Sequence, residues 1–230
     1  MLVLEHLNVV QGSFSISANW SLQAAERLAL IGPSGAGKST LLMTIAGFLA
    51  PTSGRILWNG ADIAAVAPGD RPMTILFQDQ NLFPHLTLRQ NLGLGIMPNL
   101  RLTADHIEQI ENALTRVGLA GLGARKPAQL SGGQQGRAAL ARALLRARPV
   151  LLLDEPFAAL GPALKADMLD MLDDVASATG AAVLMVTHDP NDAKRFADKT
   201  VLVADGVAHP PVATTELFTN PPPALSAYLG

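Results

Sequence analysis

The sequence predicts an α/β fold with a mainly parallel sheet, an antiparallel β subdomain at the N-terminus and an inserted helical subdomain. Three observations predict this fold. Residues 2–9 and 14–22 alternate apolar and polar residues, as strands with one solvated face do. Apolar strands and helical stretches alternate from 150 to 206, which is typical of βαβ units. From about 87 to 148 the apolar residues recur at helical spacing instead.

The N-terminal half contains the first change from strand to helix. RLALI at residues 27–31 predicts a short apolar strand, and KSTLLMTIAG after the next loop predicts a helix that stops at Gly47. The pair Asn59-Gly60 predicts a hairpin, and MTILF at 73–77 predicts a buried strand. A strand, a glycine-rich loop and a helix in this order form the context in which such loops bind phosphate.

The C-terminal half repeats the alternation. Apolar strands are predicted at 150–154, 182–187 and 200–206, with one helix from about 162 to 179 and another opened by Asp189-Pro190. This order of elements implies a parallel sheet.

Two segments lie outside this alternation. In the inserted region, Thr103 is expected to cap a helix whose apolar residues recur at helical spacing. The tail from 207 to 230 is rich in proline, so we expect no firm structure there beyond a short helix near 214–218.

Composition excludes several classes of protein. The 230 residues predict one domain, and the net charge of −2 offers no basic surface for nucleic acid, which is not expected as a partner. Without cysteine there is no disulfide, thiolate catalysis or cysteine zinc site. The N-terminus lacks the basic and long apolar regions of a signal peptide, so a cytoplasmic location is expected.

Hydrophobic residues make up 49% of the chain, and the mean hydropathy is +0.26. No apolar run approaches the roughly 18–20 residues that cross a bilayer, so the chain is not expected to span a membrane. Buried parallel strands and alanine-rich helices explain this hydropathy, and so does a surface that docks a partner. Composition does not separate these explanations.

GPSGAGKST, residues 32–40, is a phosphate loop. Its glycines let backbone N–H groups surround phosphate oxygens, Lys38 brings positive charge to the β and γ phosphates, and Ser39 offers a hydroxyl to Mg²⁺. Thr40 is expected at the α phosphate. The candidate nucleotide-binding residues here are Gly32, Pro33, Ser34, Gly35, Ala36, Gly37, Lys38, Ser39 and Thr40.

LSGGQQGR, residues 130–137, reads as a second, bare helix N-terminus, whose free N–H groups and dipole attract an anion. The candidate residues are Ser131, Gly132, Gly133 and Gln134. An ordinary helix cap is the alternative. The phosphate loop already holds one nucleotide, so the second site raises the question of which phosphate it serves.

VLLLDEP places two carboxylates at the end of an apolar strand, where ligands bind in such sheets. Asp154 is a candidate Mg²⁺ ligand, and Glu155 is a candidate general base that accepts a proton from the attacking water. The alternative is an acidic pair that caps the next helix.

Gln78 and His188 directly follow two other predicted strands, so both are expected at the same sheet edge as Asp154. That convergence predicts that they sense the γ phosphate, with Gln78 also a candidate Mg²⁺ ligand. Taken singly, each would more often be an ordinary loop residue.

GPSGAGKST, Gln78, LSGGQ, LLLDEP and His188, in this order, resemble the ATP-binding subunits of ABC transporters over essentially the whole chain. The resemblance implies a P-loop NTPase core and hydrolysis of ATP with Mg²⁺. Its implied catalytic residues are Glu155, His188, Gln78 and Lys38, and its implied metal ligands are Ser39, Gln78 and Asp154.

In that family two subunits pack head to tail. The resemblance therefore implies a dimer in which Ser131 and Gly133 of one copy face the γ phosphate held by Lys38 of the other. Each ATP then joins one phosphate loop to one signature helix, and hydrolysis releases the pair. The second anion site would serve the partner's nucleotide.

The resemblance also implies an integral membrane permease as partner and a peripheral location on the cytoplasmic face of the cell membrane. The loop LFPHL after Gln78 and the helical insertion would form the groove that receives the permease. Simple core packing is the alternative for Leu82, Phe83 and Leu86. A solute-binding protein is expected in the same complex.

The length leaves no room for the extra C-terminal domain of several importer ATPases, and stretches such as IAGFLAPTSG are most similar to ATPases of thiamine importers. This resemblance implies uptake of thiamine or a thiamine phosphate. The alternatives are an importer of a polyamine, phosphonate or iron, or a regulatory ABC ATPase without transport.

Three positions depart from the family pattern. Gly161 stands where an aspartate usually contacts the partner copy, and Gly136 replaces a larger polar residue in the signature helix. Gln11 replaces the aromatic residue that stacks on adenine, with Phe14 the nearest aromatic. We therefore expect weaker communication between the two nucleotide sites of the dimer and relaxed selectivity for the base of the nucleotide.

Overall fold

The computed structural model describes residues 1–77, 82–158 and 160–229. Its N-terminal strands form an antiparallel subdomain, in which β1 (Leu2–Gln11) pairs with β2 (Phe14–Leu22) on one side and β4 (Ser53–Trp58) on the other. β4 continues into β5 (Ala61–Asp62) through the register Trp58↔Ala61, which confirms the predicted hairpin at Asn59-Gly60.

A parallel sheet forms the centre of the molecule. Its strands are apolar and buried on both faces, which explains their nearly continuous hydrophobic sequences. In spatial order they are β9 (Lys199–Ala204), β3 (Arg27–Ile31), β8 (Ala182–Val186), β7 (Val150–Asp154) and β6 (Met73–Leu76). The carboxyl ends of these strands therefore share one edge.

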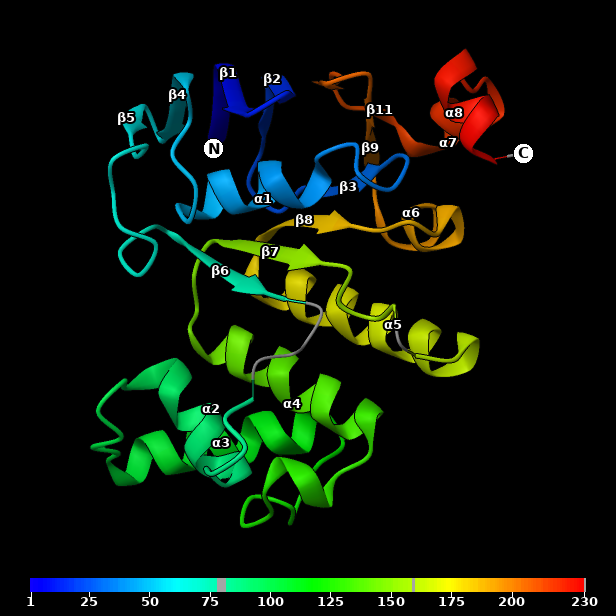
Figure 1. Cartoon of the computed structure of the whole chain (residues 1–230). Helices are drawn as coiled ribbons and strands as arrows, with labels where there is room; N and C mark the ends of the chain where they lie inside the picture. The colour runs from blue at the N-terminus through cyan, green and yellow to red at the C-terminus, as the bar shows by residue number, and fades with distance from the viewer. Residues whose placement is uncertain (78–81, 159, 230) are drawn as a thin grey trace.

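Helix α1 (Lys38–Ala46) lies between the antiparallel subdomain and the parallel sheet (Figure 1). Leu41, Leu42 and Ile45 are buried in one cluster with residues of both sheets, and Gly47 ends the helix as predicted. This packing attaches the loop before α1 to both halves of the fold.

The opposite face of the parallel sheet is covered by α5 (Pro162–Thr179) and α6 (Pro190–Phe196). Leu169, Leu172 and Phe196 are buried there against strand residues such as Leu153 and Met185. The elements expected from the βαβ alternation are thus confirmed.

The helical region consists of α2 (Leu88–Ile96), α3 (Ala104–Arg116), the short η1 (Pro127–Gln129) and α4 (Gly132–Leu145). Thr103 caps α3, since its hydroxyl accepts from the amide of His106. These helices have an apolar cluster of their own around Leu92 and Ile110. In the described ranges, no helix is both long and apolar enough to cross a membrane.

The C-terminal tail is more ordered than its prolines predict. The predicted short helix is present as α7 (Thr214–Thr219), but the tail also contains β10 (Val207–Ala208), β11 (Val212–Ala213) and α8 (Pro223–Leu229). The expectation of no further structure was wrong because proline is favourable in the first turn of a helix, and α8 begins at one.

Candidate functional site

The phosphate loop connects β3 to α1, as its sequence predicts. The ammonium of Lys38 donates to the carbonyls of Gly32 at 2.7 Å and Pro33 at 2.9 Å. Lys38 is only 6% exposed, and this desolvation lowers its pKa, whereas the nearby charges of Glu155 and Asp154 raise it. The loop therefore encloses a positive charge that is balanced by the acidic pair after β7.

Gly37 shapes the start of α1. Its φ of +99° lies in the left-handed region, and a Cβ there would approach Cζ of Phe14 to 2.4 Å. Because the N-cap residue is a glycine, it supplies no side-chain cap among the described residues, and the first N–H groups of α1 are directed at the space inside the loop.

A cavity of about 410 Å³ opens at this helix N-terminus. Its lining combines the loop residues Ser34, Gly35, Gly37, Lys38, Ser39 and Thr40 with Gln11, Phe14 and Glu155. Volumes of this size suit small-molecule ligands. Gln11 and Phe14 therefore lie where the sequence places the nucleotide base, and the loop residues lie where it places the phosphates.

Ser39 and Asp154 meet across the sheet edge although 115 residues separate them. The hydroxyl of Ser39 donates to Oδ1 of Asp154 at 2.9 Å. Burial raises the pKa of Asp154, with the charge of Glu155 adding to the rise and the Ser39 hydrogen bond and Lys38 opposing it. A hydroxyl and a carboxylate side by side are the oxygen donors that Mg²⁺ takes together with substrate phosphates, so these residues fit that ion.

Glu155 and His188 also meet, each just beyond the end of one of two adjacent parallel strands. Oε2 of Glu155 lies 3.1 Å from Nδ1 of His188. Glu155 has a φ of +46°, and its amide donates to the carbonyl of Val186 at 3.1 Å. A left-handed carboxylate residue is strained, which fits a residue held in place for function.

Gln78 lies outside the described residues, so its predicted position stays a prediction. The preceding strand β6 runs parallel to β7, with Leu76 opposite Leu153. Strand β6 therefore ends at the same sheet edge that carries Asp154.

The prediction of a bare helix start at residues 130–137 was wrong, because Ser131 and Gln134 cap this helix. The hydroxyl of Ser131 accepts from the amide of Gln134 at 3.3 Å, and Oε1 of Gln134 accepts from the amide of Ser131 at 3.0 Å. Ser131 and Gly132 are exposed, and no residue from this segment lines the phosphate-loop cavity within the described chain. The two predicted anion sites are therefore separate in one copy.

The two glycines that depart from the family pattern, Gly136 and Gly161, lie in different environments. Gly136 is buried inside α4. Gly161 is the N-cap of α5, and a Cβ there would meet nothing within 4 Å. Packing therefore leaves room for the usual aspartate at this position, and its loss is not forced by the structure.

The sequence reasoning missed Lys165. Its ammonium lies 2.9 Å from Oδ2 of Asp189 and 3.2 Å from Oδ2 of Asp192, and Asp192 also accepts from the hydroxyl of Thr187. A lysine in the first turn of a helix is disfavoured by the helix dipole, and that position was the signal that could have revealed an acidic partner. This ion cluster holds the segment on both sides of His188.

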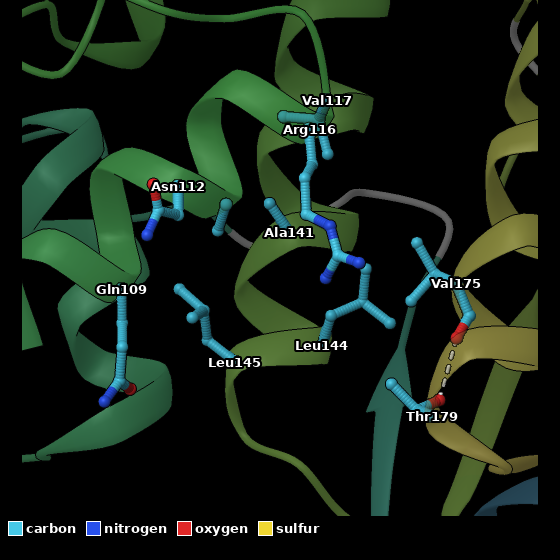
Figure 2. A pocket seen from close by; sticks show the side chains of 10 residues that line it. Gln109, Asn112, Arg116, Val117, Ala141, Leu144, Leu145, Val175 and Thr179 are labelled. Atoms are coloured by element: carbon cyan, nitrogen blue, oxygen red, sulfur yellow. Dashed lines mark hydrogen bonds between the residues drawn. The ribbon is translucent and has the colours of Figure 1, made fainter.

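Another cavity, of about 260 Å³, lies between α3, α4 and α5 (Figure 2). Arg116 points into it over an apolar floor that includes Leu144 and Val175. None of the predicted site residues lines it. This cavity therefore has no part in the predicted chemistry.

Comparison with known proteins agrees with this geometry. A family profile described as "ABC transporter" matches residues 17–158. The chain is 67% identical to the thiamine import ATP-binding protein ThiQ of Cereibacter sphaeroides and 58% identical to that of Ruegeria sp., in both cases over the full length of both proteins.

Among solved structures, the chain is similar to a dimeric bacterial ABC transporter cassette, with a TM-score of 0.80 and 29% identity over 93% of this chain and 99% of that one. The same cassette is also known as a dimer in a post-hydrolysis state bound to ADP and Pi, and the TM-score is then 0.79. The fold is thus shared with ATP-binding cassettes of known structure.

Proposed function

This chain belongs to the ABC transporter family, and on that premise we propose that it is the ATP-hydrolysing subunit of an importer for thiamine or a thiamine phosphate. The ATPase assignment is supported by the family match and by the phosphate-loop cavity, which Lys38, Ser39 and Glu155 line together. The observation that supports thiamine is the 67% identity, over the full chain, to a protein named for thiamine import. That name favours thiamine over a polyamine, a phosphonate, iron or a regulatory role.

The phosphate-loop cavity supplies the residues for ATP hydrolysis. Lys38 and the loop amides bind the β and γ phosphates, and Glu155 accepts a proton from the water that attacks the γ phosphorus. The bond from the γ phosphorus to the bridging oxygen breaks, which yields ADP and phosphate. His188, in contact with Glu155 at 3.1 Å, positions that carboxylate and senses the γ phosphate, together with Gln78.

Ser39 and Asp154 would hold Mg²⁺, with Gln78 as a third ligand. When bound, this ion neutralises charge on the β and γ phosphates. The 2.9 Å contact between Ser39 and Asp154 supports the assignment, because it puts two oxygen ligands beside the cavity before any ligand arrives.

The complete site is shared by two copies. Ser131 and Gly133 would face the γ phosphate on the partner copy, and ATP would hold the head-to-tail pair together until it is hydrolysed. The exposure of Ser131 and Gly132 and the dimeric form of a related cassette support this arrangement, whereas Gly133 is buried beside Leu164 in the single copy.

We assign the chain to a single domain with a helical subdomain inserted at about 87–148. The permease would dock beside this subdomain. Phe48 and Phe83 are 48% and 46% exposed, and the Phe48 ring lies 5.8 Å from that of Phe77. Leu82 instead packs against the core. The aromatic residues therefore suit docking, whereas Leu82 suits the core-packing alternative.

The permease contact would keep this chain at the cytoplasmic face of the cell membrane, as a peripheral subunit. A solute-binding protein would deliver thiamine from the other side of the membrane. Both proposals follow from the importer assignment and not from particular residues of this chain.

The decisive experiment is uptake of labelled thiamine by cells that lack this gene and carry either the wild-type chain or a Ser131 variant. Ser131→Asp keeps a good helix cap and adds a carboxylate where the partner's γ phosphate would lie, whereas Ser131→Asn caps without charge. We expect uptake with the wild type, most of it with Asn and none with Asp. Uptake that never depends on the gene would overturn the thiamine assignment, and equal uptake with Asp and Asn would overturn the shared site.

A further inference from the structure

The C-terminal helix α8 reaches the segment that carries His188. The hydroxyl of Tyr228 donates to the backbone carbonyl of His188 at 2.5 Å, across 40 residues of sequence. Tyr228 is the single tyrosine of the chain and stands close to its C-terminal end. Neither the tail nor this residue has a part in the function proposed above.

Helix α8 is anchored at the parallel sheet. Leu225 is fully buried in an apolar cluster with Ile31, Leu202 and Leu217, and Tyr228 packs against the same cluster. Ile31 is the last residue of β3, directly before the phosphate loop. The position of Tyr228 is therefore set by the same strand that carries the nucleotide site.

The backbone around His188 is fixed from two sides. On the far side, Asp189 receives the ammonium of Lys165 and caps α6 through the amide of Asn191. On the near side, Tyr228 holds the carbonyl of His188. The imidazole itself is 52% exposed, and within the described residues its hydrogen-bond partner is Glu155. An exposed ring with one partner keeps its direction only if its backbone is held.

We propose that Tyr228 is a positioning residue, whose hydroxyl holds the carbonyl of His188 and so keeps the imidazole directed at Glu155. It acts through His188 and touches neither ATP nor the attacking water. This inference rests on the proposed ATPase function, because it assigns a role in that reaction.

The kinetic test compares Tyr228→Phe with Ser226→Ala in the full-length purified protein. Tyr228→Phe removes only the hydroxyl, whereas Ser226→Ala removes another hydroxyl-to-carbonyl bond of α8, to Pro221, that does not reach His188. One hydrogen bond corresponds to about a fivefold change, so we expect Tyr228→Phe to lower kcat about fivefold with KM for ATP unchanged. Ser226→Ala should leave both constants unchanged.

A spectroscopic test needs no hydrolysis. Because the chain has one tyrosine, 3-fluorotyrosine incorporation gives a single ¹⁹F signal that reports Tyr228 alone. Burial raises the pKa of Tyr228, and the carboxylates of Glu155 and Asp189 add to the rise. We expect the fluorophenol to titrate above a free fluorotyrosine reference, and Glu155→Gln to lower that pKa.

The two tests separate the inference from the proposed function. A wild-type kcat in the Tyr228→Phe protein would overturn the positioning role. Reductions in kcat and thermal stability that are the same in Tyr228→Phe and Ser226→Ala would overturn it as well. If the fluorophenol at position 228 titrates like the free reference, and its pKa does not change with Glu155→Gln, the contact itself is overturned. A wild-type protein that never hydrolyses ATP, yet shows the raised pKa, would overturn the proposed function and leave the contact established without a catalytic role.

Discussion

The N-termini of α1 and α4 are both glycine-rich, yet they are built differently. α1 begins at Gly37 in the left-handed region without a side-chain cap, and the buried Lys38 follows at once. α4 begins at the exposed Ser131, whose side chain forms a capping box with Gln134. The first therefore directs its amides into a cavity of its own chain, whereas the second presents an already stabilised helix end to the outside.

This difference teaches how a site can be divided between two copies. In the proposed dimer, the half that binds the nucleotide would need open amides and a cation within one chain. The half that would recognise the bound γ phosphate would have to be stable and exposed before the partner copy binds. A capped helix end meets that need, since the helix dipole still favours an anion after the cap has formed.

The largest effect is expected at the N-terminus of α1, in the phosphate loop. Lys38→Met should lower the affinity for ATP about 100-fold, because loss of a charged hydrogen-bond donor in a desolvated site costs about 3 kcal/mol. Isothermal titration calorimetry measures this affinity. The matched variant Ser131→Asp should bind ATP as the wild type does at protein concentrations that keep it monomeric. Equal losses in the two variants would break the distinction between the halves.

The next effect compares two glycines at helix starts, Gly37 as the N-cap of α1 and Gly132 as the first residue of α4. Gly37→Ala should lower the free energy of unfolding by about 1–3 kcal/mol, because the new Cβ meets Phe14 and needs a left-handed backbone. Gly132→Ala should leave it unchanged or slightly higher, because nothing lies within 4 Å of a Cβ there. Thermal unfolding checks both. A Gly132 variant as unstable as the Gly37 variant would contradict the open, exposed end inferred for α4.

A smaller effect concerns Asp154, whose pKa is raised chiefly by burial. A raised pKa means that the charged carboxylate costs stability at neutral pH and that protonation favours the folded state. Asp154→Asn, which can still accept from Ser39, should therefore raise the melting temperature at pH 7 without ligand. The gain should shrink as the pH falls toward about 4, where a carboxyl is ordinarily protonated.

The variant should also lose the stabilisation that Mg²⁺ and ATP give the wild type. Asp70→Asn, at an exposed position away from the site, is the matched control and should show neither change. A destabilised Asp154→Asn protein at pH 7 would show that the carboxylate is held by contacts stronger than its desolvation cost.

The smallest effect is expected at Gly161, the N-cap of α5. Gly161→Asp should raise the free energy of unfolding by about 0.5 kcal/mol, through a side-chain cap and the helix dipole. Gly161→Asn adds a comparable cap without the charge and should raise it less. Differential scanning calorimetry resolves the order of the three proteins. No gain in either variant would mean that the α5 N-terminus is satisfied in another way.

Much of the site was predictable because its signals are local. The phosphate loop and the carboxylates at the end of β7 are each encoded within a few neighbouring residues. The cap that Ser131 and Gln134 form on α4 is equally local, and the interpretation as a bare helix start overlooked it. The tail was misjudged for the opposite reason, since the burial of Leu225 beside Ile31 depends on a contact almost 200 residues away. Proline counts alone favoured an irregular chain there.

Lys165 shows the same limit inside the core of the site. Its two carboxylate partners follow it by 24 and 27 residues, and they reach it only because α5 and α6 pack on the same face of the sheet. Periodicity places each helix but not the side chains that meet between two of them.

By itself, the sequence determined the order of the main strands and helices up to the C-terminal tail and the residue types that can bind phosphate. The hydrophobic period, capping and turn residues act over short stretches of chain, so they can be recognised in the sequence without knowledge of the fold. Only the tertiary structure decided that Ser39 meets Asp154, that His188 meets Glu155 and that Tyr228 reaches the same edge. The physical reason is that parallel strands and packed helices bring together residues that are far apart in the chain.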